Sequence, residues 1–555
     1  MSSHFLPVKP KQVYSLQTRD GQRLDADVYF PDAAGPWPVL LMRQPYGRAI
    51  ASTVVYAHPT WYAAHGYIVV IQDVRGRGTS EGVFELFAHE VDDGYDSVQW
   101  AAQLPGSNGH VGMYGFSYQG MTQLYAAQSQ PPALKALAPA MVGYDLYHDW
   151  AYENGALRLQ AGLGWAIQLA AETARLQGDP TAFNALRTAS RNLPLNGAVT
   201  ATPDVLKQYA PDSFWHSWIA HPKDDDYWHT LKPDLTDVDL PMLHVGGWFD
   251  PYLTGDLRLF KEMATKSQYP QPLRVGPWSH IPWSRKVGDW DFGSEAMNPI
   301  DKLQIQWFDS WLKDNDTGLL DQPPIHLFEM GSHQWQRFDQ WPSRSPTQTY
   351  ELKSSGLAAM REDDGALVLP SKQVSVAPPV SDVLVHDPWR PVPSLGGHAS
   401  FPSGCFERSA IDGRSDVLTY TTGLLDTELA VVGNVTVTVN IEADASSYDL
   451  CAVLSVVYPN HRVFNLTQGY SRIDGGQPQT ISLPLHPTCF RLIPGQALRL
   501  SLSAACFPAY SVNPGGTRTF PLDRVPTIEH RTITLTVYQD GDTYLTLPLA
   551  DGQVF

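Results

Sequence analysis

Apolar positions in the first third of the chain fall into short, unbroken runs separated by polar turns. Val39–Met42 and Tyr67–Ile71 are two such runs, and runs of this length are typical of strands buried on both faces of a parallel sheet. Before a third predicted strand at His110–Tyr114, the segment Glu90–Trp100 begins with acidic residues and spaces its apolar residues at helical intervals. The order strand, helix, strand predicts a doubly wound α/β sheet.

The pattern changes to a helical one from about residue 141 to residue 235. Segments such as Leu157–Leu176 are rich in Trp, Leu and Ala, with little strand character. Strands are predicted again at Met242–Val245 and Leu273–Val275, followed by a helix at Ile300–Leu312. We therefore expect the helical block to be an insertion in the α/β domain.

After a Pro- and Ser-rich stretch at residues 341–346, the apolar residues alternate with period two, as at Val435–Ile441 and Ile533–Val537. Many short strands separated by Gly and Pro are typical of a β-sandwich or jelly roll. We predict an α/β domain (1–140 and 236–345), a helical cap (141–235) and a C-terminal all-β jelly-roll domain (346–555).

Composition and charge narrow the classes of function. The chain has 555 residues, of which 43% are hydrophobic and 17% charged. This length is too great for a single hydrophobic core, so we predict a globular protein of two or three domains. The net charge of −18 and the lack of any Lys/Arg run argue against nucleic acid as a partner. No apolar run has the length of a membrane span, and the N-terminus lacks a basic segment followed by an apolar one. We expect a cytoplasmic protein with no membrane partner, and a homo-oligomer is left open.

All four cysteines lie in the last third of the chain, at Cys405, Cys451, Cys489 and Cys506. Their spacing matches neither a metal knuckle nor a redox pair, so we predict no metal and no cofactor. A cytoplasmic location favours free buried thiols, and a disulfide is left open for another location.

The segment His110–Thr122 carries the strongest candidate for chemistry. An apolar strand leads into Ser117, which is flanked by glycines, and then into a helix. A nucleophile elbow needs this arrangement because the sharp turn lifts the serine hydroxyl above the sheet. The usual G-x-S-x-G pattern has Gln119 at its last position, and Gly120 follows. We predict Ser117 as the nucleophile.

Two later strands end in the partners that such a serine requires. Asp250 follows the strand that begins at Met242, and His280 follows the strand that begins at Leu273. The order Ser, acid, His is the one that the α/β topology demands. His244 is the competing histidine, but it lies inside a strand and is expected to be a packed core residue.

An acyl-transfer site also needs hydrogen-bond donors for the oxyanion. The backbone N–H of Tyr118, directly after the predicted nucleophile, is one candidate. The loop after Val39–Met42 should supply the other, and it lacks a Gly-rich lipase motif. A side-chain donor is therefore needed, and the phenol of Tyr46 is the candidate.

Taken together, these motifs resemble the cocaine-esterase-like and X-Pro dipeptidyl-peptidase-like serine hydrolases, which include the α-amino acid ester hydrolases. The resemblance covers nearly the whole chain and implies an α/β-hydrolase domain, a helical cap and a C-terminal jelly roll. It also implies that Ser117, Asp250 and His280 form the triad and that Tyr46 and Tyr118 form the oxyanion hole. The motifs that carry it are Pro45-Tyr46, Asp73–Gly82, Gly115–Gly120, Gly247–Asp250, Gly276–His280 and Arg414–Tyr420.

The predicted substrate is a small-molecule acyl ester or amide. The resemblance implies an acyl pocket formed by Trp150, Trp165 and Tyr252, with Phe249 beside them, and an aromatic pocket suits an apolar acyl group such as benzoyl. The glycine run at 76–78 lacks the phosphate-loop pattern and is expected to be structural.

X-Pro dipeptidyl-peptidase and α-amino acid ester hydrolase activities remain alternatives, and both would require carboxylates to bind a substrate ammonium. Asp145, Asp149 and Glu153 lie at the cap entrance, and the last two would share one face of a helix. We expect these carboxylates to be solvated, and the orientation toward the pocket is left open. Gln119 and Pro251 depart from the family pattern and favour ester hydrolysis. An inactive carbohydrate-binding protein is a further alternative.

Overall fold

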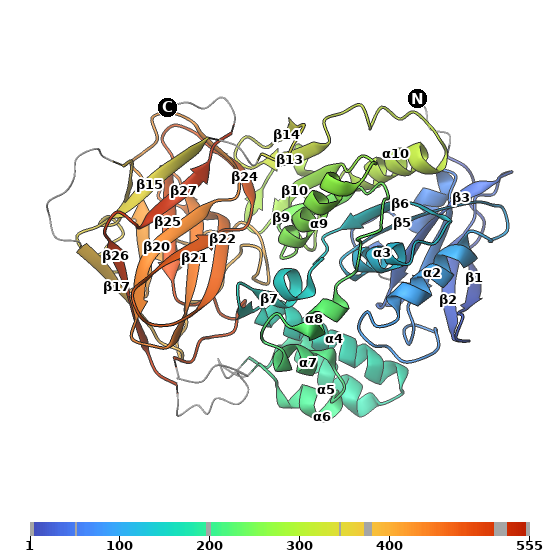
Figure 1. Cartoon of the computed structure of the whole chain (residues 1–555), viewed down its shortest axis with the longest axis horizontal. Helices are drawn as coiled ribbons and strands as arrows, with labels where there is room; N and C mark the ends of the chain where they lie inside the picture. Colours follow the sequence, from blue (N-terminus) through green and yellow to red (C-terminus); the bar gives the residue numbers. More distant parts are fainter. Residues whose placement is uncertain are drawn as a thin grey trace.

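The computed structural model describes residues 5–49, 53–195, 201–342, 346–370, 380–515 and 530–550. In Figure 1 an α/β domain lies on the right, an all-β domain lies on the left, and the helices of the insertion lie below and between them. The predicted boundary at 345/346 adjoins residues 343–345, which lie outside the described residues, so the domain limits stay a prediction.

A ten-stranded sheet forms the centre of the α/β domain, in the order β1-β2-β4-β3-β5-β6-β9-β10-β13-β14. Its strands from β3 to β13 run parallel to one another. The apolar runs expected to be doubly buried strands are β3 and β4, and the residues of both are almost entirely buried. The strands are β1 (Gln12–Gln17), β2 (Arg23–Tyr29), β3 (Trp37–Gln44), β4 (Ile68–Asp73), β5 (Ser107–Phe116), β6 (Leu134–Ala140), β9 (His244–Phe249), β10 (Leu273–Ser279), β13 (Ile325–Glu329) and β14 (Gln334–Phe338).

Helices cover both faces of this sheet. Helices α1 (Pro59–Ala64) and α10 (Ile300–Leu312) contribute to the apolar core on one face. The helices α2 (Glu90–Ala101), α3 (Tyr118–Gln128) and α9 (Leu253–Lys266) contribute to cores outside that one. The helices predicted at Glu90–Trp100 and Ile300–Leu312 are thus confirmed.

The helical segment is inserted in the sequence between β6 and β9, two strands that are neighbours in the α/β sheet. Strand β6 pairs with β9 at Ala140 and Val245, although more than a hundred residues separate them in the sequence. The insertion therefore leaves the sheet continuous. Its elements are a π-helical turn, Leu146–Ala151, the short strands β7 (Tyr152–Glu153) and β8 (Ala156–Leu157), and the helices α4 (Leu159–Leu176), α5 (Pro180–Arg191), α6 (Asp204–Tyr209), α7 (Phe214–Ala220) and α8 (Asp226–Leu231).

The C-terminal part is built from strands, as the period-two pattern predicts. Strand β20 (Thr436–Ala443) buries Val437, Val439 and Ile441 completely, because alternate side chains of a strand face the same side. Within the described residues, eleven of the strands form the main sheet, and two more, β19 and β24, form a separate two-stranded sheet; the description of this part as a jelly roll stays a prediction. The other strands are β15 (Thr347–Lys353), β16 (Ala366–Val368), β17 (Val380–His386), β18 (Val417–Thr421), β19 (Leu429–Gly433), β21 (Ser447–Val457), β22 (Val463–Asp474), β23 (Gln479–Pro484), β24 (Thr488–Leu492), β25 (Ala497–Ser503), β26 (Ile533–Gln539) and β27 (Tyr544–Pro548).

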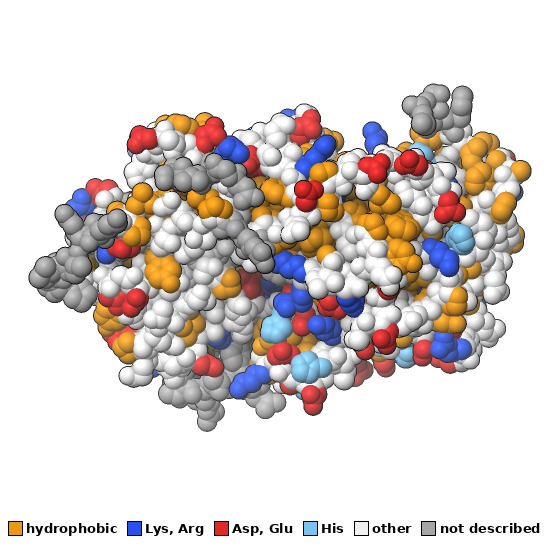
Figure 2. Space-filling view, turned by 45° about the horizontal axis from the view of Figure 1, so that its top comes forward, with side chains coloured by type: hydrophobic (Ala, Val, Ile, Leu, Met, Phe, Trp, Pro, Cys, Tyr) orange, Lys and Arg blue, Asp and Glu red, His pale blue; other side chains and the backbone are white. Residues whose placement is uncertain are grey.

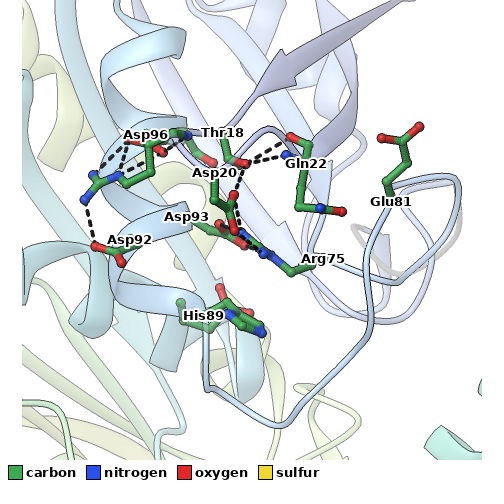
Figure 3. A network of polar contacts seen from close by, with 12 residues as sticks. Thr18, Asp20, Gln22, Arg75, Glu81, His89, Asp92, Asp93 and Asp96 are labelled. Atoms are coloured by element: carbon green, nitrogen blue, oxygen red, sulfur yellow. Dashed lines mark hydrogen bonds and ion pairs between the residues drawn. The ribbon is translucent and has the colours of Figure 1, made fainter.

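A network of ion pairs fixes the loop that follows β4. Arg75 lies between Asp20, in the turn after β1, and Asp93 of α2 (Figure 3). Neighbouring Arg19 pairs with Asp92 and Asp96 of the same helix. The β1–β2 hairpin, the loop and α2 are therefore held as one unit.

Gly76 and Gly78 of the Gly-Arg-Gly run have a structural role, as expected. A Cβ on Gly78 would lie 1.9 Å from the carboxylate of Asp73, and one on Gly76 would lie 2.3 Å from the backbone of Phe84. Both glycines also have positive φ angles, of 57° and 68°, which L side chains rarely adopt. The two glycines therefore permit a close approach of the chain.

Within the described ranges, no helix is both long and apolar enough to cross a membrane. Figure 2 shows acidic and basic side chains intermingled over the visible face rather than gathered by sign. The four cysteines are free and buried, as the sequence analysis expected.

Candidate active site

Ser117 occupies a sharp turn between β5 and α3. Its backbone has φ 60° and ψ −126°, a conformation that costs energy for a residue with a side chain. The turn is held because the Ser117 N–H donates to the carbonyl of Ala140, at 2.9 Å. Although Ser117 is the N-cap residue of α3, its hydroxyl makes no capping hydrogen bond, so the oxygen is left for other partners.

The glycines of this turn are required by close contacts. A Cβ on Gly115 would lie 2.4 Å from the Cβ of Gln119, and one on Gly120 would lie 2.4 Å from a methyl group of Val142. Gln119, which replaces the usual glycine, is buried and accepts a hydrogen bond from the N–H of Phe116. The departure at Gln119 is therefore accommodated within the elbow.

Asp250 and His280 meet at the carboxyl ends of β9 and β10. The Oδ1 of Asp250 lies 2.7 Å from Nδ1 of His280, and its Oδ2 accepts the N–H of Tyr252 at 3.1 Å. The carboxylate is fully buried, while the imidazole is 26% exposed. His244, in contrast, is buried within β9 beside Gln271, as expected for a core residue.

The phenol of Tyr46, predicted to bind the oxyanion, contacts Trp165 of α4. Its oxygen accepts a hydrogen bond from Nε1 of Trp165, at 3.1 Å. Burial raises the pKa of Tyr46 to about 12, while hydrogen bonding to Trp165 and Ser117 and the charge of Arg77 act in the opposite direction. The phenol is therefore protonated at neutral pH and is able to donate.

Arg48 anchors the loop that carries Tyr46. Its guanidinium bonds to Asp73 at 2.5 Å and to Asp27 at 2.9 Å, and its N–H also donates to Asp73. Both carboxylates are almost completely buried. These bonds fix the loop to strands β2 and β4.

Tyr118 begins α3, where backbone N–H groups have no partner within the helix. Its phenol donates to Glu90 at 2.8 Å, and Glu90 pairs with the fully buried Arg43 at 2.5 Å. This buried network holds the side chain of the first residue of α3. This network could not be predicted, because nothing in a single sequence pairs Arg43 with Glu90.

A chain of aromatic contacts connects His280 to Tyr46. The Tyr252 ring lies 5.0 Å from His280 and 4.5 Å from Trp150, measured between centroids. Trp150 lies 5.0 Å from Trp165, which bonds to Tyr46 as described. Phe116, which precedes Ser117, lies 5.3 Å from His280, measured between ring centroids. The predicted base His280 therefore lies beside Tyr252 of the predicted acyl pocket and beside the residue that precedes Ser117.

Phe249 is not part of this chain of contacts. Its side chain is 1% exposed and lies in a separate apolar core, 6.1 Å from Phe292. The prediction that Phe249 lines the pocket is therefore not supported by its position. Its neighbour Trp248 is buried in the same core, so this end of β9 packs against that core.

The expectation that the cap carboxylates are solvated is wrong for Asp149 and Glu153. Asp149 is fully buried and pairs with Arg258 at 3.1 Å. Glu153 is buried in β7 and pairs with Arg158 at 2.9 Å. The two do not share a helix face, because the chain is π-helical at Asp149 and extended at Glu153.

Asp145 is also engaged by neighbouring groups. It caps the π-helical turn by accepting the N–H of His148 at 3.1 Å and lies 4.0 Å from Nζ of Lys232. All three cap carboxylates thus already bind donors of this chain.

The fold and the site define an α/β-hydrolase with a helical cap. Residues 20–282 match the X-Pro dipeptidyl-peptidase (S15) family, and residues 317–542 match the X-Pro dipeptidyl-peptidase C-terminal non-catalytic domain. The chain is 32% identical, over 528 residues, to cocaine esterase of Rhodococcus sp. (strain MB1 Bresler), and the match covers 89% of this chain and 90% of that esterase.

Solved structures share the fold over almost the whole length. An aminopeptidase from a marine sediment Thaumarchaeota archaeon superposes with a TM-score of 0.83 at 23% identity, covering 97% of this chain and 96% of the other. An α-amino acid ester hydrolase gives a TM-score of 0.78 at 20% identity, covering 99% and 98%.

The chain belongs to the family of serine hydrolases that contains cocaine esterase and the X-Pro dipeptidyl-peptidases. It is therefore a hydrolase, and the alternative of an inactive carbohydrate-binding protein finds no support.

Proposed function

We propose that this protein is a serine esterase that hydrolyses acyl esters through Ser117, His280 and Asp250. The observation that carries the proposal is the 2.7 Å hydrogen bond between the buried Asp250 and His280, at the same sheet edge as the strained turn at Ser117. A buried carboxylate that holds Nδ1 of a histidine leaves Nε2 free to accept a proton.

In the proposed reaction, His280 Nε2 takes the Ser117 proton while the Ser117 oxygen attacks the acyl carbonyl. Asp250 stabilises the resulting imidazolium. The tetrahedral oxyanion accepts hydrogen bonds from the phenol of Tyr46 and the N–H of Tyr118. His280 then protonates the departing alcohol, and a water attacks the acyl-enzyme by the same route to release the acid.

The cap supports an uncharged, apolar acyl group as the substrate class. Trp150, Trp165 and Tyr252 offer aromatic faces beside His280 and Tyr46. A substrate with a free ammonium group would need a carboxylate partner, and Asp149 and Glu153 are held by Arg258 and Arg158. Ester hydrolysis is therefore favoured over X-Pro peptide and α-amino ester cleavage.

We further propose that the protein acts in the cytoplasm on small molecules, without nucleic acid or a membrane as partner. Its four free, buried thiols support this location, since a reducing compartment preserves thiols.

The test compares an uncharged aryl ester with an N-terminal X-Pro anilide on the purified protein, and repeats both with Ser117→Ala. We expect fast ester turnover, slow anilide turnover and a loss of about 10⁶-fold in kcat for Ser117→Ala. A fluorophosphonate should label the wild type at Ser117 only. Retained turnover in Ser117→Ala would refute the nucleophile, and fast anilide cleavage with slow ester turnover would refute the substrate class.

A further inference from the structure

A buried polar cluster from the helical insertion and the C-terminal domain contacts the backbone of Asp250 and Pro251 in the α/β domain. Its members are almost completely buried and come from the insertion and from the C-terminal part of the chain. Figure 1 places β7, where the cluster begins, between the two sheets. The cluster consists of Glu153, Arg158, His398, His486 and Tyr510.

Two members of the cluster hold consecutive backbone carbonyls of the turn after β9. Nε2 of His486 lies 3.1 Å from the carbonyl oxygen of Asp250. Nη1 of Arg158 donates to the carbonyl of Pro251 at 2.6 Å. Because a carbonyl oxygen can only accept, Nε2 of His486 carries the proton.

The rest of the cluster fixes these two donors. Glu153 accepts hydrogen bonds from Arg158 at 2.9 Å, His398 at 2.9 Å and Tyr510 at 2.5 Å. The rings of His398 and His486 are stacked, with centroids 3.9 Å apart and planes within 11° of each other. The position of His486 is therefore over-determined by its neighbours.

Charge in the cluster is set by the same contacts. Burial lowers the pKa of His486 well below its usual value, and the neighbouring His398 and Arg158 lower it further, while Glu153 acts in the opposite direction. His486 is therefore a neutral donor at neutral pH. Burial alone would raise the pKa of Glu153, but His398 and Arg158 outweigh it and hold the pKa well below its usual range.

We propose that His486 and Arg158 are positioning residues that fix the Asp250 turn, so that the C-terminal all-β domain completes the alignment of Asp250 with His280. This inference rests on the proposed role of Asp250. Its physical basis is that the carboxylate can hold the imidazole at 2.7 Å only while its own backbone is fixed, and small misplacements in such sites cost large factors in rate.

The test replaces His486 by Phe, which keeps an aromatic ring next to His398 but removes the donor, and by Gln, whose amide can replace Nε2–H. A matched control exists in His386 of β17, which is also buried and hydrogen bonded to a backbone carbonyl, that of Asn513 at 3.0 Å. The same two substitutions at His386 test for a general effect of losing such a bond in this domain.

For His486→Phe we expect kcat for an aryl ester to fall about 10- to 100-fold, with KM changed by less than about 3-fold. The acid limb of the pH profile of kcat/KM should move to lower pH, because the His280 imidazolium loses stabilisation by Asp250. His486→Gln should recover most of kcat. His386→Phe should leave kcat and the pH profile unchanged even where it lowers the melting temperature.

Unchanged kcat and acid limb in His486→Phe, or equal losses in His386→Phe, would overturn the inference. Should His486→Phe fail to fold, the comparison of His486→Gln with the shorter His486→Asn replaces it, and equal kcat in these two would overturn it. Ser117→Ala separates the two proposals. Activity in that variant refutes the proposed nucleophile, whereas its inactivity together with a normal His486→Phe enzyme refutes only the positioning role.

Discussion

The oxyanion hole gives the sharpest prediction, through the substitution Tyr46→Phe. This change removes one hydroxyl group and keeps the ring in place. Removing one oxyanion donor from a dry site costs about 2.7–4 kcal/mol of transition-state stabilisation, or about 10²–10³ in kcat. We expect KM to change little, because the phenol should bind the oxyanion more strongly than the ground-state carbonyl.

The same substitution also removes the acceptor of the Trp165 indole N–H. Loss of this bond should cost about 1 kcal/mol of folding free energy, which is too small to unfold the protein. The stability and kinetic effects therefore separate cleanly. Steady-state kinetics with an uncharged aryl ester and urea unfolding measure the two quantities.

A matched control is Tyr152→Phe, which removes a buried hydroxyl of the cap that donates to the carbonyl of Trp218 at 3.0 Å. It should cost a similar amount of stability and leave kcat unchanged. The assignment of Tyr46 is refuted if Tyr46→Phe retains kcat within about 3-fold of the wild type, or if it raises KM alone, since uniform binding would then be lost.

Three further predictions concern other parts of the structure. Asp250→Asn should lower kcat about 10⁴-fold while Ser117 remains in place, as steady-state kinetics will measure; a fall of less than about 10-fold would argue against the acid. Burial lowers the pKa of His244 to about 4, so below about pH 6.5 the unfolded state binds a proton that the folded state does not, and stability falls as the pH falls. His244→Gln should therefore remove up to about 3 kcal/mol of the stability that the protein loses on acidification, measured by urea unfolding at several pH values. An unchanged pH dependence would contradict this. Gly120→Ala should destabilise the protein by about 1–3 kcal/mol and reduce activity, because the new Cβ would lie 2.4 Å from Val142; wild-type thermal stability would show that the elbow relaxes.

The strands of the sheet could be identified from the sequence because they depend on local pattern, and the triad was predicted from where those strands end. The apolar runs that became β3 and β4 are buried on both faces, and doubly buried strands have no polar alternation to obscure them. Asp250 and His280 were predicted to lie together because parallel strands present their carboxyl ends at one edge. The structure places these two side chains 2.7 Å apart.

The role of the cap carboxylates could not be predicted in the same way. Asp149 and Glu153 are four residues apart, a spacing that suggests a helix, yet one lies in a π-helical turn and the other in a strand. Their burial depends on Arg258 and Arg158. Local spacing carries no information about such partners, since burying a carboxylate is favourable only where a cation is supplied.

The sequence by itself determined the succession of strands and helices, the sharp turn at Ser117 and the order of the predicted triad, because backbone preferences and hydrophobic periodicity act over a few residues. Tertiary structure alone decided which groups surround Asp250. His486, 236 residues further along the chain, reaches the Asp250 carbonyl only after the all-β domain has docked against the α/β domain. Contacts of this kind arise from the packing of whole domains, and no local pattern in the sequence encodes them.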